Sequence, residues 1–262
     1  MKILAIIGSP RKKGNTYRVV EQIKEKMLEY DNSIDFEYLF LRDYNLQMCT
    51  GCFACIGQGE DSCPLKDDRQ LIEARMSEAE GIIFAAPTYA MGVPGLMKNF
   101  IDRFAYTCHR PYFFDKVFMA VTTIGASRGM KLTLEQLAVL TGGGKLVKKL
   151  GVAMPPIPMA GYAQKAKRDI EKASKAFYAA LKKRDKKLPG LADWAWFHSF
   201  KSLCSVEAYQ KVCPADCSYY REKEEYFYPM AGHPIRRLLG KIFGGIMRLS
   251  FRFIIKKGKE RS

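Results

Sequence analysis

Apolar residues in the first part of the chain gather in short runs, separated by longer stretches in which apolar positions recur every three or four residues. Short, nearly continuous apolar runs are typical of parallel strands that are buried on both faces. Helical spacing between such runs indicates crossover helices, so strands and helices should alternate. The runs predict five strands, at 2–7, 35–41, 81–86, 116–123 and 147–154. The pattern therefore favours a doubly wound α/β fold with a parallel five-stranded sheet.

The stretches between these strands predict helices. In the first of them, Val19, Val20 and Ile23 share one face while Glu21 and Lys24 lie on the other, as expected for a surface helix on a sheet. The predicted helices are 17–28, 69–76, 96–103, 131–140 and 164–187.

The loop after the first strand reads Gly-Ser-Pro-Arg-Lys-Lys-Gly-Asn-Thr from position 8. It offers two hydroxyl donors, a forked guanidinium and a glycine that lets the backbone approach an anion closely. Asn15 and Thr16 are expected to open the next helix, whose free N–H groups favour negative charge. The loop has neither the Walker triplet nor the Rossmann three-glycine spacing, and an ordinary capped turn is the alternative. The predicted phosphate contacts are Ser9, Arg11, Gly14, Asn15 and Thr16.

A stretch of little periodicity, 42–66, follows the second strand and contains Cys49, Cys52, Cys55 and Cys63. Loops of this length in a compact domain are usually functional. The spacing Cys-x2-Cys-x2-Cys-x7-Cys-Pro is similar to the ligation of a cubane iron–sulfur cluster. A thiol redox site, a zinc site and structural cysteines remain alternatives.

The third strand runs into Pro-Thr-Tyr-Ala-Met-Gly-Val-Pro-Gly, residues 87–95. Ligands of doubly wound sheets bind beyond the carboxyl ends of the strands, near the point where the strand order reverses. A turn rich in Pro and Gly that binds no ligand is the alternative.

Together, the loop at 8–16 and the stretch at 87–95 resemble the NAD(P)H-dependent FMN reductase family, which has a flavodoxin-like fold. The cysteine loop resembles that of its iron–sulfur flavoprotein subgroup, where four cysteines hold a [4Fe–4S] cluster near the flavin. The resemblance implies a sheet of order 2-1-3-4-5, so that the first and third strands flank one crevice. It also implies FMN as cofactor, NAD(P)H as electron donor and a homo-oligomer, a dimer or a tetramer.

The resemblance assigns the flavin ring to the loops after the third and fourth strands. Pro87 and Tyr89 would form an apolar wall, and backbone amides would supply donors. Arg128 is a candidate for a nucleotide phosphate instead. No residue is expected to act as acid or base, because the flavin carries the redox chemistry. The expected ring contacts are Pro87, Thr88, Tyr89, Ala90, Met91, Gly92, Thr123, Gly125 and Ser127.

Two functions follow from this resemblance. One is an FMN-dependent NAD(P)H oxidoreductase that reduces a flavin, a quinone or another small acceptor. The other is an iron–sulfur flavoprotein that carries electrons with a ferredoxin-type partner. A redox sensor that uses the cysteine loop is a third, weaker hypothesis.

Composition limits the other classes of function. Apolar residues make up 48% of the 262 residues, enough for a packed core. The start shows no signal peptide and the longest uncharged stretch is broken by Pro and Gly, so a cytoplasmic protein is expected. The net charge of +16 lies in the second half, since residues 1–144 carry 17 basic and 17 acidic side chains. No nucleic-acid motif accompanies it, and no nucleic-acid partner is predicted.

The region 190–262 lies outside the predicted flavodoxin-like domain, 1–189, and is expected to be an α-rich extension. Cys204, Cys213 and Cys217 have no apparent fourth ligand, so no second metal site is predicted. Residues 233–257 repeat apolar positions at helical spacing between basic ones. Such a helix can lie in a membrane interface or pack on its own domain or on a dimer partner. Its glycines weaken it, which favours packing.

Overall fold

The computed structural model describes residues 1–125, 128–157, 159–230 and 233–259. The chain divides into two compact units. The first, here called the sheet unit, consists of Met1–Thr50, Leu65–Cys108 and Tyr112–Lys187. The second, the helical unit, consists of Gly51–Pro64, His109–Pro111 and Leu188–Ser262. Most of the cysteine loop thus belongs to the same unit as the C-terminal helices, although more than a hundred residues separate them in sequence.

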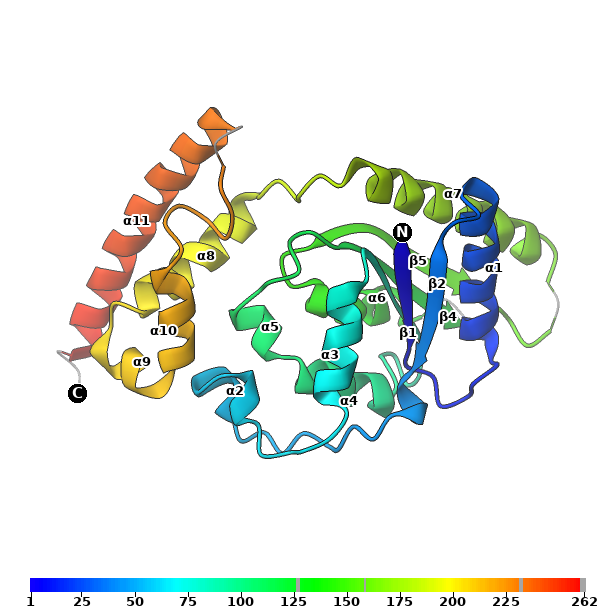
Figure 1. The fold of residues 1–262 in the computed structure, drawn as a ribbon, viewed down its shortest axis with the longest axis horizontal. Helices are drawn as coiled ribbons and strands as arrows, with labels where there is room; N and C mark the ends of the chain where they lie inside the picture. The colour runs from blue at the N-terminus through cyan, green and yellow to red at the C-terminus, as the bar shows by residue number, and fades with distance from the viewer. Residues whose placement is uncertain (126–127, 158, 231–232, 260–262) are drawn as a thin grey trace. The chain divides into compact units, whose positions relative to one another are not determined.

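The sheet unit contains five parallel strands in the order β2-β1-β3-β4-β5 (Figure 1). This confirms the predicted flavodoxin-like topology, and the reversal of strand order lies between β1 and β3. The strand ends differ from the prediction by two residues at most, with the largest shift where β5 begins. The strands are β1 (Lys2–Ile7), β2 (Asp35–Phe40), β3 (Gly81–Pro87), β4 (Val117–Ile124) and β5 (Lys145–Ala153).

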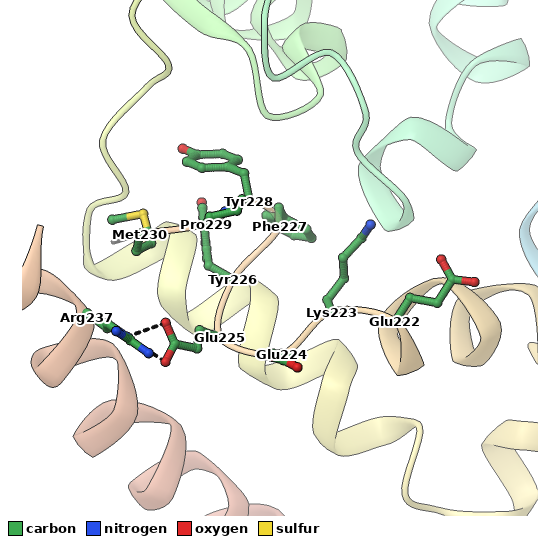
Figure 2. A pocket seen from close by; sticks show the side chains of 10 residues that line it. All are labelled: Glu222, Lys223, Glu224, Glu225, Tyr226, Phe227, Tyr228, Pro229, Met230 and Arg237. Atoms are coloured by element: carbon green, nitrogen blue, oxygen red, sulfur yellow. Dashed lines mark hydrogen bonds and ion pairs between the residues drawn. The ribbon is translucent and has the colours of Figure 1, made fainter. Parts of the chain in front are cut away.

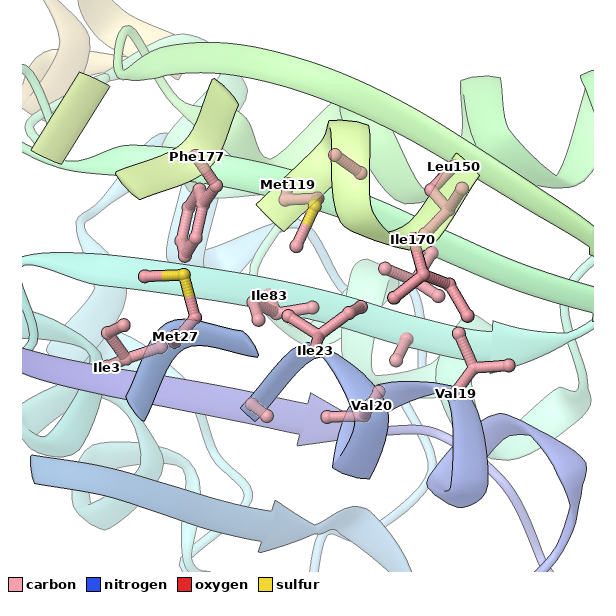
Figure 3. Close-up of a cluster of buried hydrophobic side chains, with 14 of the residues drawn as sticks. Ile3, Val19, Val20, Ile23, Met27, Ile83, Met119, Leu150, Ile170 and Phe177 are labelled. Atoms are coloured by element: carbon pink, nitrogen blue, oxygen red, sulfur yellow. The ribbon is translucent and has the colours of Figure 1, made fainter. Parts of the chain in front are cut away.

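Helices cover both faces of this sheet. On one face α1 and α7 enclose the main core, in which Ile23 and Phe177 pack over Ile83 of β3 (Figure 3). On the other face, Phe84 of β3 packs against Phe100 of α4, with ring centroids 6.0 Å apart. The helices of this unit are α1 (Asn15–Tyr30), α3 (Arg69–Glu78), α4 (Gly95–Arg103), α5 (Tyr106–His109, whose last residue belongs to the helical unit), α6 (Met130–Ala138) and α7 (Tyr162–Lys183), with 3₁₀ turns at Leu41–Asp43 and Val139–Thr141.

The helical unit confirms the α-rich C-terminal extension. Its core is aromatic: the ring of Phe197 lies 5.0 Å from that of Phe227 and 5.4 Å from that of Tyr226. The cysteine segment packs into this unit closely, because a Cβ on Gly57 would lie 2.7 Å from the carbonyl oxygen of Val212. The unit contains α2 (Ala54–Gly57), a 3₁₀ turn at Glu60–Ser62, α8 (Leu191–Leu203), α9 (Glu207–Val212), α10 (Pro214–Arg221) and α11 (Pro234–Lys259).

The helical unit should lose stability in mild acid because of His198. This side chain is 6% exposed and its ring stacks on Trp194. Burial, aided by the charge of Arg248, lowers the pKa of His198 from 6.5 to about 4. Between those values the unfolded chain binds a proton that the folded chain does not, so the free energy of unfolding falls as the pH falls. The total loss is expected to be on the order of 3 kcal/mol.

Both tryptophans of the chain, Trp194 and Trp196, lie in α8, so tryptophan fluorescence during urea denaturation reports on the helical unit. Measured at several values of pH, the midpoint should drop between pH 6.5 and 4. The variant His198→Gln should show a flatter pH profile over this range. An unchanged slope in that variant would assign the acid sensitivity to another group.

Candidate functional site

The carboxyl ends of β1, β3 and β4 meet at the point where the strand order reverses. The backbone N–H of Gly8 donates to the carbonyl of Ala85 over 2.8 Å, and that of Thr88 donates to the carbonyl of Thr123 over 2.9 Å. The loops that leave these strands are therefore held side by side, as in other doubly wound sheets that bind a ligand at this edge.

These loops surround one pocket in the sheet unit. All the cofactor contacts expected in described residues line it, except Ala90, Met91 and Gly92, which form the next turn. Ser127 lies outside the described residues. Ile124 also lines the pocket and was not predicted, although it stands between two residues that were. The lining residues are Ser9, Arg11, Gly14, Asn15, Thr16, Pro87, Thr88, Tyr89, Thr123, Ile124 and Gly125.

The first turn of α1 borders this pocket without a side-chain cap. The helix begins at Asn15, Gly14 is its N-cap residue, and no side chain caps it or places a negative charge in its first turn. The helix opens at Asn15 and Thr16 as expected, and the hydroxyl of Thr16 does not cap it, because it is hydrogen-bonded over 2.8 Å to that of Thr123. The backbone N–H groups of the first turn thus remain available to an anion, which the helix dipole favours.

The hydroxyl of Ser9 and the guanidinium of Arg11 are two further donors at this pocket. Ser9 is buried, and its Oγ accepts a 3.2 Å hydrogen bond from the backbone N–H of Arg11. Its own hydroxyl hydrogen can therefore donate into the pocket. The residue before Ser9 must be glycine, because a Cβ on Gly8 would lie 2.6 Å from Cβ of Met97. The result is a cradle of N–H and O–H donors with the cation of Arg11 at its edge.

The turn from Tyr89 to Gly92 is closed by hydrogen bonds in both directions, of 2.8 and 3.0 Å. Its two central residues, Ala90 and Met91, have φ values of 45° and 72°. Positive φ at both positions is typical of a type I′ turn, which normally uses Asn or Gly. The chain therefore holds a strained turn next to the pocket, a feature that clusters at ligand sites.

Gly129 supports this turn, and its replacement should be costly. Gly129 has a φ of +90°, and a Cβ on it would lie 2.8 Å from Cα of Met91. The variant Gly129→Ala should lose about 2 kcal/mol of stability through strain and overlap. Gly95→Ala is the matched control, because nothing lies within 4 Å of a Cβ there and alanine favours its helix. Thermal unfolding followed by circular dichroism measures both, and equal melting temperatures would contradict the expectation.

Asn99, a residue of α4, fixes the backbone position of Cys49. The backbone N–H of Cys49 donates to Oδ1 of Asn99 over 2.9 Å. Nδ2 of Asn99 in turn donates to the carbonyls of Leu46 (3.0 Å) and Gln47 (3.2 Å). One polar side chain thus fixes the backbone that leads into the cysteine motif.

The other three predicted cluster ligands, Cys52, Cys55 and Cys63, belong to the helical unit. Arg110 stabilises their segment, since its guanidinium donates to the carbonyl of Ile56 over 2.8 Å and to Glu60 over 3.1 Å. Across the described ranges, no three His, Cys, Asp or Glu side chains are arranged to hold a metal ion.

The anchor of this segment is Asp216 on α10, which the sequence analysis did not single out. Asp216 is fully buried and interacts with Nδ1 of His109 (2.9 Å), with the hydroxyl of Tyr209 (2.7 Å) and with Arg110. Burial by itself raises the pKa of Asp216, but the hydrogen bonds with His109 and Tyr209 outweigh it and the pKa lies below its ordinary value. This carboxylate ties the cysteine segment to the C-terminal helices.

Comparison with known proteins agrees with this architecture. The family model for NADPH-dependent FMN reductase matches residues 1–155. An iron–sulfur flavoprotein of Archaeoglobus fulgidus is 35% identical over 158 residues, covering 60% of this chain and 72% of the relative. An iron–sulfur flavoprotein of Clostridioides difficile is 29% identical over 218 residues, covering 81% of this chain and 93% of the relative.

Among solved structures, a flavone reductase superposes with a TM-score of 0.53 at 18% identity, covering 70% of this chain and 63% of the other. An NAD(P)H:quinone oxidoreductase from Methanothermobacter marburgensis superposes with a TM-score of 0.51 at 15% identity, covering 67% and 98%. At these identities the likeness shows the fold alone. The match over residues 1–155, together with the relative that is 35% identical, places the chain in the NADPH-dependent FMN reductase family, where its curated relatives include iron–sulfur flavoproteins.

Proposed function

We propose that this protein is an FMN-dependent oxidoreductase that passes electrons from NADH or NADPH through FMN to an acceptor. The observation that carries the proposal is the pocket at the ends of β1, β3 and β4, with an uncapped helix N-terminus on one side. A phosphate needs the donors that this cradle supplies. The family match supports FMN as the molecule that brings the phosphate.

The residues at the pocket divide between the two ends of the cofactor. Ser9, Arg11 and the first turn of α1 would hold the phosphate. The isoalloxazine ring would lie against Pro87 and Tyr89, with the strained turn at 89–92 beside it. Bound FMN would supply the redox chemistry, accepting a hydride from the nicotinamide and releasing electrons to the acceptor.

Two measurements test this function. Titration of cofactor-free protein with FMN should quench flavin fluorescence with a stoichiometry of one per chain. The loaded protein should then oxidise NADH or NADPH in the presence of a quinone or free flavin. Failure to bind FMN would refute the proposal, and binding without NAD(P)H oxidation would favour the carrier function described next.

The second candidate is an electron carrier with a [4Fe–4S] cluster and a ferredoxin-type partner. Its support is the spacing of Cys49, Cys52, Cys55 and Cys63 and the names of the relatives from Archaeoglobus fulgidus and Clostridioides difficile. Protein purified without oxygen should then contain about four iron and four sulfide per chain. Protein that contains flavin but no iron would exclude this second candidate and leave the FMN-dependent oxidoreductase as the remaining one. The proposed homo-oligomer and cytoplasmic location stay predictions.

A further inference from the structure

One face of α11 packs on α8 through glycines. A Cβ on Gly240 would lie 2.6 Å from the ring of Trp194, and one on Gly244 would lie 2.4 Å from the ring of His198. Both glycines are buried. The two helices therefore approach closely along this face, which accounts for the expected packing of the C-terminal helix on its own chain.

The opposite face of α11 is apolar and uncovered within the described part of the helical unit. Its residues follow one another at intervals of three, one, three, four and three positions, which places them on one stripe. Each is more than half exposed: Ile235 (75%), Leu238 (60%), Leu239 (56%), Ile242 (53%), Ile246 (56%) and Leu249 (67%). An apolar stripe of this length on a surface marks an interaction site.

The charge of the C-terminal segment indicates which kind of partner surface the stripe fits. Residues 233–262 carry nine basic side chains and one acidic one. Arg237, Lys241 and Arg248 are exposed on α11, and Glu225 pairs with the first two, as Figure 2 shows for Arg237. Two copies of so basic a segment would repel each other across a shared face. An anionic surface complements both the apolar stripe and its cationic flank.

We propose that α11 lies in the interface of an anionic lipid bilayer, with the stripe from Ile235 to Leu249 buried among the acyl chains and the basic side chains among the headgroups. No helix in the described ranges, α11 included, is both long enough and apolar enough to cross a membrane. In the proposed position, α11 lies along the membrane surface, as amphipathic helices of this kind do. It would bring the flavin site to acceptors that reside in the bilayer, and this consequence depends on the function proposed above.

The test uses the full chain and vesicles of phosphatidylcholine, with and without phosphatidylserine in equal amount. Co-sedimentation should occur with the anionic vesicles and fall with added salt. The double variant Ile242→Ser/Ile246→Ser should bind at least about tenfold more weakly, because it removes apolar area from the interface. Leu71→Ser/Val139→Ser is the matched control, since these side chains are 52% and 50% exposed on the sheet unit, and it should bind like the parent protein.

The variant Arg248→Glu isolates the electrostatic contribution to vesicle binding, because it reverses one of the charges beside the apolar stripe of α11 and leaves the stripe intact. Its binding to anionic vesicles should fall several-fold, while any weak binding to neutral vesicles stays unchanged. Equal binding by all variants, or no binding by the parent protein, would overturn the proposal. A dimer in analytical ultracentrifugation that the double serine variant dissociates would assign the stripe to a second copy instead.

Discussion

Replacing Arg11 with alanine should weaken FMN binding by about 10- to 100-fold and leave riboflavin binding within about twofold of the parent protein. Arg11 is exposed and stands at the edge of the donor cradle, so under the proposed function its loss removes a charge-assisted hydrogen bond to phosphate. Riboflavin lacks the phosphate and is therefore insensitive to this change. Fluorescence titration with both flavins measures the two affinities.

Lys13→Ala is the matched control for this experiment. Lys13 belongs to the same loop and is exposed, but it does not line the pocket. The Lys13→Ala variant should retain most of the affinity for FMN, because a solvated charge outside the pocket contributes little to binding. If Arg11→Ala weakened FMN and riboflavin equally, the cradle would not be the phosphate site.

The variant Asp216→Asn should destabilise the helical unit by about 3–5 kcal/mol. The change removes the buried counter-charge of the Arg110 guanidinium and leaves it only the more exposed carboxylate of Glu60, 3.1 Å away, and it disturbs the hydrogen bonds of His109 and Tyr209. Urea denaturation followed by the fluorescence of Trp194 and Trp196 measures the loss. Acid should act in the same direction on the parent protein. Since the folded pKa of Asp216 is depressed, its contribution is present above the ordinary value of 3.8 and is lost as the pH falls below it.

Glu207→Gln is the control for this carboxylate. Glu207 is also on a helix of the helical unit, but its ion pair with Lys211 is solvent-exposed. The urea midpoint of this variant should remain that of the parent protein, as for most exposed pairs. A similar midpoint for Asp216→Asn would mean that the buried network does not stabilise the unit.

Sequence reasoning was most successful where one local pattern decides the outcome. The apolar runs located the five strands because a strand buried on both faces has little room for polar side chains. It was less accurate where a strand is partly exposed: β5 begins two residues early, at Lys145, and contains Lys148 and Lys149. The donor residues of the loop at 8–16 were also predicted from a local pattern, whereas the residues expected to contact the flavin ring after β3 and β4 came from the family resemblance and from the rule that such loops meet at one edge of the sheet.

Interactions between distant residues were beyond such reasoning. No sequence pattern indicates that the hydroxyl of Thr16 pairs with that of Thr123, 107 positions away. The left-handed backbone at Ala90 and Met91 was not predicted, because it contradicts the usual preference of both residues. The turn also packs tightly against a distant residue, since a Cβ on Gly129 would lie 2.8 Å from Cα of Met91.

The amino-acid pattern alone was enough to predict the five parallel strands, the donor-rich loop at 8–16 and the basic amphipathic character of the C-terminus, because each depends on residues close together in the chain. The order of the strands came from the family resemblance. Folding in three dimensions decided that residues 51–64 belong with the C-terminal helices, that Asp216 anchors them, and that α11 turns its glycines inward and its apolar stripe outward. These outcomes depend on which surfaces bury one another, and burial is settled only when segments far apart in sequence come into contact.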